Sequence, residues 1–311
     1  MNTRLRPLLG TFVEVHVRGL EERRAQAAIE EAFACIRTVD ERMSAHEPQS
    51  DLGRLYERGA FEAIEVHPWT FRVIRASLFL QWLSDGIFDI SVGQVLAQNR
   101  FLPVWHPRVI VNPCAVLFDI ELLDDFRIRF RRPLRIDLGG IAKGFVVDRA
   151  VEALLAAGAE SGCVNAGGDF RIFGPRAEPL VLRNPGNPRQ LVRVGEIQVG
   201  AVATSATYFS RRKRDNRMAS PLIDGRTRMS LDFPESITVI ASSCMWADAL
   251  TKTMAADPQR GASLLKHFDA HAFSLSSNKS GSRLRVLRIP AEIDAAIKPK
   301  RKNGPAHDQN L

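Results

Sequence analysis

The amino-acid sequence predicts an α+β fold, with mixed sheets and packed helices in one large unit that could divide into two lobes. Residues 11–17 (TFVEVHV) alternate apolar and polar, which is typical of a strand with one buried face. Apolar residues recur at three- and four-residue steps over 22–43, which predicts a helix. The chain has 311 residues, of which 45% are hydrophobic, and neither a repeat nor a Pro/Gly-rich linker divides it. That length and composition are enough for one substantial core.

Further elements follow along the chain. A helix over 68–84 opens at Pro68, a residue favoured in the first helical turn, and closes at Asp85-Gly86. Residues 134–138 form a short apolar segment, predicted to be a strand that ends near Asp137. The remaining predicted elements are a helix over 142–157 that ends at Gly158, strands over 161–166, 191–199 and 236–242, and a helix over 245–256.

The predicted domain covers residues 1–292. The last residues, 293–311, are polar and basic, and we expect them to be disordered. The formal net charge of +8 comes partly from basic runs at 211–214 and 298–302. No nucleic-acid recognition motif accompanies these runs, so we expect no nucleic-acid partner.

Cysteine spacing and hydropathy indicate the cellular compartment in which the protein is expected. The four cysteines are far apart and form no C-x-x-C pair, so their spacing does not indicate a zinc site or a redox motif. The pattern favours a reduced compartment. No apolar run is long enough for a membrane helix, so no integral membrane segment is expected. The first 17 residues lack the pattern of a signal peptide, and no cysteine precedes Cys35. We therefore expect a cytoplasmic protein.

The segment DLGGIAKG (137–144) is the strongest candidate for ligand binding. Two glycines between a predicted strand and a predicted helix let backbone approach a ligand closely. The helix start offers free N–H groups to a phosphate, and Lys143 adds a positive charge there. The pattern is neither the G-x-G-x-x-G fingerprint nor a P-loop. A tight turn without a ligand explains the glycines equally well.

Four other segments carry polar residues in suggestive places, and each also has a purely structural explanation. Asp248 and Thr251 in ADALTKT share one helical face and offer hard oxygen ligands, although Asp is common near helix starts. Asp89 in FDIS lies between apolar residues and needs a partner. Asp224 in LIDGRT can either stabilise a turn or belong to the ligand site. The glycine pair in NAGGDF (165–170) can likewise either permit a tight turn or make room for the ligand.

The order of these segments resembles the FAD:protein FMN transferases, the ApbE family, once described as thiamine-biosynthesis lipoproteins. The resemblance extends over about residues 5–260. Its motifs are LGTFVEV (9–15), RMSAHEPQSDLGRL (42–55), GIFDISVG (86–93), DLGGIAKGFVVDRA (137–150), VNAGGDFRIFG (164–174), AVATSATY (201–208), PLIDGRT (221–227) and SCMWADALTKT (243–253).

The resemblance implies an ApbE-like architecture, a Mg²⁺ cofactor, and transfer of FMN from FAD to a threonine hydroxyl of an acceptor redox protein, with release of AMP. Attack on a pyrophosphate needs charge neutralisation and positioning more than covalent chemistry by the protein. By match to the family's motifs, the magnesium ligands are the backbone oxygen of Gly140 and the side chains of Asp248 and Thr251. The expected flavin-nucleotide contacts are Leu9, His46, Ile87, Phe88, Asp89, Asp137, Lys143 and Ile223.

Two departures from the family pattern affect the chemistry. Pro221 stands where the family commonly has a histidine, and proline cannot accept a proton. If that histidine is the base in the family, either Asp224 or a metal-bound group has to replace it here. Lys252 stands where many members have a metal-binding threonine. Either Thr251 replaces that ligand, or Lys252 contacts a phosphate directly and reduces the need for metal. The alternatives to a transferase are an FAD pyrophosphatase that releases FMN and AMP, and a non-catalytic FAD-binding protein.

Overall fold

A computed structural model of the chain describes residues 2–104, 117–208, 210–214, 217–278 and 281–288. The predicted tail, 293–311, lies outside these residues. Among the described helices, none is both long and apolar enough to cross a membrane.

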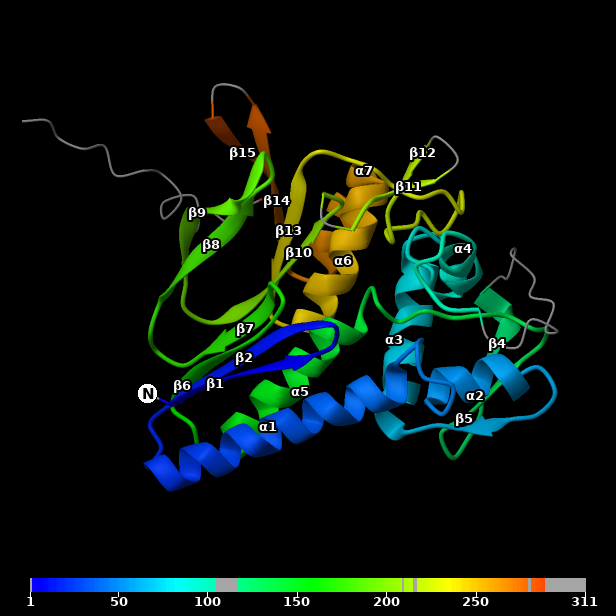
Figure 1. Cartoon of the computed structure of the whole chain (residues 1–311), viewed down its shortest axis with the longest axis horizontal. Helices are drawn as coiled ribbons and strands as arrows, with labels where there is room; N and C mark the ends of the chain where they lie inside the picture. The colour runs from blue at the N-terminus through cyan, green and yellow to red at the C-terminus, as the bar shows by residue number, and fades with distance from the viewer. Residues whose placement is uncertain (1, 105–116, 209, 215–216, 279–280, 289–311) are drawn as a thin grey trace, which may run out of the picture.

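An eight-stranded sheet is the largest sheet in the described part of the chain (Figure 1). Neighbouring strands are antiparallel throughout, in the order β1-β2-β6-β7-β10-β13-β14-β15. The strands are β1 (Asn2–Leu8), β2 (Thr11–Arg18), β6 (Ser161–Ala166), β7 (Asp169–Phe173), β10 (Gly200–Ala206), β13 (Ser236–Ala241), β14 (His271–Asn278) and β15 (Gly281–Arg288).

Helices cover one face of this sheet, and a two-stranded ribbon covers the other. The helices are α1 (Glu22–Met43), α5 (Ala142–Ala156) and α6 (Cys244–Ala256), and the ribbon is β8 (Glu178–Asn184) with β9 (Asn187–Ile197). Alternation along β10 shows the two faces: Ala201 and Ala203 belong to the core under the helices, whereas Val202 belongs to the core under the ribbon.

A further group of elements extends the helical side of the molecule, at the right of Figure 1. The main hydrophobic core is continuous between the two regions, since Val13 of β2 and Leu80 belong to one cluster of buried side chains. This group comprises α2 (Asp51–Arg58), α3 (Pro68–Leu83), a 3₁₀ helix (Ile90–Val92), α4 (Gly93–Gln98), a second 3₁₀ helix (Leu117–Asp119), β3 (Ile64–Glu65), β4 (Ile120–Leu122) and β5 (Arg127–Phe130).

Three shorter elements complete the described structure. Helix α7 (Pro258–His267) follows α6 after a one-residue break at Asp257, whose side chain caps it by accepting a hydrogen bond from Arg260 N. Strands β11 (Arg212–Arg214) and β12 (Arg217–Ala219) form a small hairpin.

The α+β fold class is confirmed, and most predicted elements are present. The helices expected over 22–43, 68–84, 142–157 and 245–256 correspond to α1, α3, α5 and α6. The strands expected over 11–17, 161–166, 191–199 and 236–242 correspond to β2, β6, part of β9 and β13.

The strand predicted over 134–138 is wrong. This segment is buried but has no strand partner in the described structure. Leu134, Ile136 and Leu138 pack into the core, and the backbone N–H of Asp137 donates a hydrogen bond of 2.8 Å to Ile90 O. The apolar run correctly predicted that the segment is buried, but a buried segment need not form hydrogen bonds with a neighbouring strand.

Candidate active site

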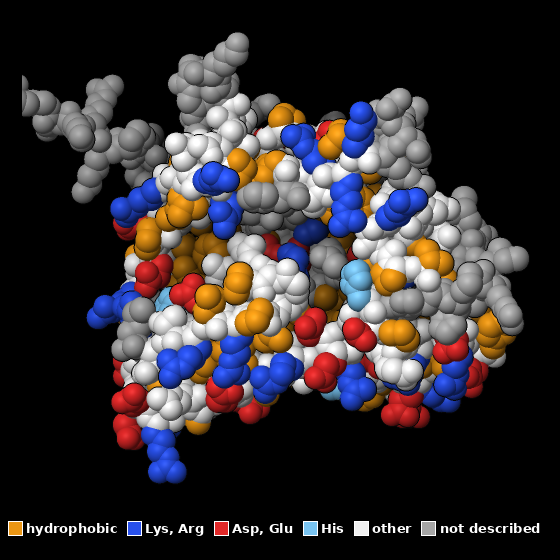
Figure 2. All heavy atoms as spheres, viewed as in Figure 1, with side chains coloured by type: hydrophobic (Ala, Val, Ile, Leu, Met, Phe, Trp, Pro, Cys, Tyr) orange, Lys and Arg blue, Asp and Glu red, His pale blue; other side chains and the backbone are white. Residues whose placement is uncertain are grey.

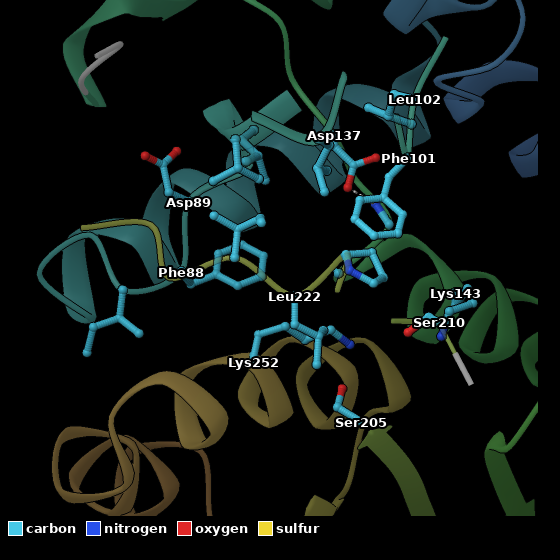
Figure 3. Close-up of a pocket in the computed structure, with 18 of the residues that line it drawn as sticks. Phe88, Asp89, Phe101, Leu102, Asp137, Lys143, Ser205, Ser210, Leu222 and Lys252 are labelled. Atoms are coloured by element: carbon cyan, nitrogen blue, oxygen red, sulfur yellow. Dashed lines mark hydrogen bonds between the residues drawn. The ribbon is translucent and has the colours of Figure 1, made fainter. Parts of the chain in front are cut away.

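A cavity of about 340 Å³ lies where the sheet, helices α5 and α6 and the region around the Ile90–Val92 helix meet (Figure 3). Its volume suits a small-molecule ligand. A hollow with both basic and acidic side chains is visible in the middle of the face in Figure 2. The wall is built from separate parts of the chain, within 87–92, 96–102, 137–143, 204–210, 221–223 and at 252.

The cavity gathers most of the residues that the sequence singles out. Figure 3 shows Lys252 entering from α6 on one side, with Asp137 and Phe101 on the opposite side. The predicted site residues on the wall are Ile87, Phe88, Asp89, Asp137, Gly140, Lys143, Ile223 and Lys252.

The first half of helix α5 packs closely against the N-terminal half of helix α6, and this contact positions Lys143 and Asp248. Asp148 of α5 accepts hydrogen bonds from the backbone N–H groups of Cys244 and Met245, both at 3.0 Å, and so caps α6. Gly144 lies so close to α6 that an added Cβ would be 2.1 Å from Cys244 O. Its N–H donates a hydrogen bond of 3.1 Å to Asp248 Oδ2. Lys143 and Asp248 are therefore brought to the same end of two helices.

Two lysines and two aspartates form a cluster of charges at the cavity. Lys143 pairs with Asp169, and Lys252 pairs with Asp248; the two carboxylate side chains are 3% and 0% exposed. Burial favours the neutral form of Lys143, but the Asp169 and Asp248 carboxylates outweigh it and raise the pKa of Lys143. Burial raises the pKa of Asp169, whereas Lys143 and Lys252 outweigh burial at Asp248 and lower its pKa. Lys143 therefore presents positive charge to the cavity, and Lys252 lies on the same wall, paired with Asp248.

Two more carboxylates line the cavity wall, each with a raised pKa. Burial raises the pKa of Asp89, although Arg228 Nη2 donates to its Oδ2 at 2.6 Å. Burial also raises the pKa of Asp137, whose Oδ2 accepts a hydrogen bond of 3.1 Å from Gly139 N. A carboxyl group that is buried in this way can accept or donate a hydrogen bond to a polar ligand.

Two of the three predicted magnesium ligands, Asp248 and Thr251, already have hydrogen-bond partners within the protein. Asp248 Oδ1 accepts from the Lys252 ammonium, and Oδ2 accepts from Gly144 N. The Thr251 hydroxyl donates to Asp248 O and meets Ser205 Oγ, both at 2.7 Å. No group of three or more His, Cys, Asp or Glu suited to a metal occurs among the described residues. The residues at this position therefore suit the Lys252 ammonium, which pairs with Asp248, better than they suit a divalent metal ion.

Other predicted residues lie off the cavity wall. Leu9 lies in a shallow surface groove, where its N–H donates a hydrogen bond of 3.4 Å to Asp40 Oδ2. His46 is exposed, yet it lies near enough to Asp137 to act on that carboxyl electrostatically. Asp224 directly follows the wall residues 221–223, and its Oδ1 accepts from Arg226 N at 2.9 Å, so it also builds its own turn.

Several residues at the site were not predicted. Asp169, at the end of the glycine pair in NAGGDF, holds Lys143 and accepts a hydrogen bond of 3.2 Å from Thr204 N. An acidic residue directly after two glycines was the available signal. Arg212 lies over the ring of Phe101, 5.1 Å from its centroid, and Phe101 lines the cavity. No pattern in the sequence connects those two residues, because they meet only in the folded chain.

Comparison with known proteins gives consistent results. A family model described as the ApbE family matches residues 9–274. The FAD:protein FMN transferase of Vibrio cholerae is 28% identical over 241 residues, which cover 73% of this chain and 72% of the relative. The solved structure of the ApbE protein of Thermotoga maritima has a TM-score of 0.80 at 23% identity and covers 96% of this chain and 99% of its own. The flavinyl transferase ApbE of Pseudomonas stutzeri has a TM-score of 0.77 at 20% identity and covers 95% and 96%. These two structural likenesses confirm the fold.

Proposed function

The chain belongs to the ApbE family, and on that premise we propose that it transfers the FMN part of FAD to a hydroxyl group of an acceptor protein. The observation that carries the proposal is the cavity itself. It brings together residues from the FDIS, DLGGIAKG and ADALTKT segments, with two lysines on its wall. The curated relatives named FAD:protein FMN transferase support the same activity.

The reaction is a displacement at phosphorus. The acceptor oxygen forms a bond to the FMN-side phosphorus of FAD, the bond from that phosphorus to the bridging oxygen breaks, and AMP leaves. The acceptor hydroxyl loses its proton during this step. Lys143 and Lys252 offer positive charge to the pyrophosphate, and Asp89 and Asp137 offer polar contacts to the nucleotide. The apolar wall, with Phe88, suits the flavin ring.

We propose Asp224 as the proton acceptor. Pro221 lines the cavity where the family commonly has a histidine, and it has no basic group. Asp224 directly follows the wall residues 221–223 on the same segment, and its side chain is 10% exposed.

The acceptor we propose is a redox protein, modified on a threonine. Magnesium is the family expectation for charge neutralisation, but Lys252 occupies the carboxylate that would bind it.

An acceptor assay tests the proposal. The protein is incubated with FAD and a peptide or domain that carries a threonine flavinylation motif, in chelator and in Mg²⁺. We expect the acceptor mass to increase by one FMN and one AMP to appear per adduct. AMP and free FMN without an adduct would identify a pyrophosphatase instead, and intact FAD after hours would identify a binding protein.

A further inference from the structure

The path of the Lys252 side chain through the site is the starting observation. This side chain leaves α6 and lies against Gly140: a methyl group added to Gly140 would be 3.6 Å from Cε and 3.7 Å from Cγ of Lys252. Its ammonium ends on Asp248 Oδ1. The lysine therefore fills the space between the Gly140 backbone and the Asp248 carboxylate, while it also lines the cavity.

The surroundings of the ammonium favour a permanent cation at this position. The Asp248 side chain is fully buried, and each of its oxygens already accepts one hydrogen bond from the protein. A buried carboxylate needs a compensating charge, and Lys252 supplies it. A divalent ion on the same carboxylate would have to displace the ammonium or be repelled by it.

The ammonium also has donors to spare for a ligand. A lysine ammonium has three N–H donors, and Asp248 engages one of them. The side chain is 16% exposed and lies on the cavity wall. Lys143 lines the same cavity and is held in the same way by buried Asp169. Two anchored ammonium groups thus face one cavity.

Resting on the function proposed above, we propose that Lys252 is the built-in cation of this site. Its ammonium, together with that of Lys143, binds the pyrophosphate of FAD, and both binding and transfer proceed without a divalent metal. Asp248 holds Lys252 in place and is not a metal ligand in this chain.

Metal dependence of FAD binding tests this inference directly. Binding is followed by quenching of flavin fluorescence, in chelator and in millimolar Mg²⁺ or Mn²⁺, and Mn²⁺ binding is followed by electron paramagnetic resonance. For the unaltered protein we expect FAD affinity in chelator to lie within twofold of its value in metal. We also expect no stoichiometric Mn²⁺ site, with or without FAD.

Variants at position 252 separate the ammonium from the rest of the site. Lys252→Thr removes the cation and frees Asp248 Oδ1. We expect its FAD affinity in chelator to fall about 10- to 100-fold, as for loss of a charged hydrogen bond, and Mn²⁺ to restore it. Lys252→Arg should bind FAD without metal. Lys266→Thr, which removes an exposed lysine on α7, is the matched control and should behave like the unaltered protein.

Three results would overturn the inference. These are loss of FAD binding by the unaltered protein in chelator, a stoichiometric Mn²⁺ site in that protein, and unchanged affinity of folded Lys252→Thr in chelator. If Lys252→Thr does not fold, the chelator and Mn²⁺ measurements on the unaltered protein decide alone. Failure of the proposed function is distinct, because it is the absence of an FMN adduct under every metal condition even though FAD binds.

Discussion

Asp224 and Pro221 lie on the segment that closes one side of the cavity, and of these two only the aspartate can take a proton. We expect Asp224→Asn to lower the rate of FMN transfer by about 100-fold or more, the usual contribution of a general base. The amide keeps an oxygen for the hydrogen bond from Arg226 N, so the turn and FAD affinity should be retained. Rates are measured by acceptor mass, and affinity by flavin fluorescence.

A rescue variant makes this test specific. Pro221→His in the Asp224→Asn background places an imidazole on the cavity wall, and we expect part of the rate to return. An unchanged rate in Asp224→Asn would rule out Asp224 as the base.

Asp137 links the site to stability and pH. Burial raises its pKa in the folded protein, so the folded state binds this proton more tightly than the unfolded chain does. Stability from this group is present below the ordinary Asp pKa of about 3.9 and is lost as pH rises through the raised value. At pH 7, Asp137→Asn removes a buried negative charge and should therefore increase the free energy of unfolding. We expect a gain of roughly 0.5–2 kcal/mol, which is common for a single stabilising substitution.

Urea unfolding at pH 7 and near pH 3.5 measures this effect. The stabilisation by Asp137→Asn should shrink at the lower pH, and FAD affinity should fall because a cavity contact changes. The exposed Asp124→Asn is the control for removal of a carboxylate, and its free energy of unfolding at pH 7 should stay within about 0.5 kcal/mol of that of the unaltered protein. Equal or lower stability of Asp137→Asn at pH 7 would contradict the argument.

At the scale of elements, the contact between α5 and α6 determines the site. Gly144→Ala would place a methyl group 2.1 Å from Cys244 O, which is backbone and cannot rotate away. We expect the helices to separate, with a loss of about 1–3 kcal/mol in the free energy of unfolding. FAD affinity should fall as well, because Lys143 and Asp248 lie on the displaced helices.

Gly140→Ala is the matched control for this prediction. Its methyl group would meet side-chain atoms no closer than 3.4 Å, so the fold should remain stable while the cavity becomes smaller. Thermal unfolding followed by circular dichroism compares the two variants. A melting temperature for Gly144→Ala equal to that of Gly140→Ala would show that the close approach is not required.

The elements also show where sequence patterns are informative. The helical period of α1 runs without interruption, and its bounds were predicted to the residue. Helix α2 was missed, although Ser50 caps it by accepting a hydrogen bond of 3.0 Å from Gly53 N. Gly53 lowers the helix propensity of this short segment and interrupts the apolar periodicity that would indicate a helix. The segment 134–138 was predicted to be a strand because it is apolar, but burial by itself does not pair a strand.

At the scale of the molecule, the site depends on the order of the sheet strands. Strand β7 pairs with β10, so Asp169 at the start of β7 lies beside Thr204, which lines the cavity. Asp169 starts β7 and reaches Lys143, 26 residues earlier, while Gly144 reaches Asp248, 104 residues later. Such pairs have no signature in one sequence.

The sequence by itself determined the fold class, the long helices, the ordered motifs and therefore the family, because periodicity and motif order are properties of the chain. It also placed Asp248 and Lys252 four residues apart on one face of a helix. Only the tertiary structure decided that this face turns toward Gly140 and the cavity, that Asp169 joins the cluster, and that Leu9 lies elsewhere. The physical reason is that side-chain partners across elements depend on how helices and strands pack, and packing is fixed by the whole core.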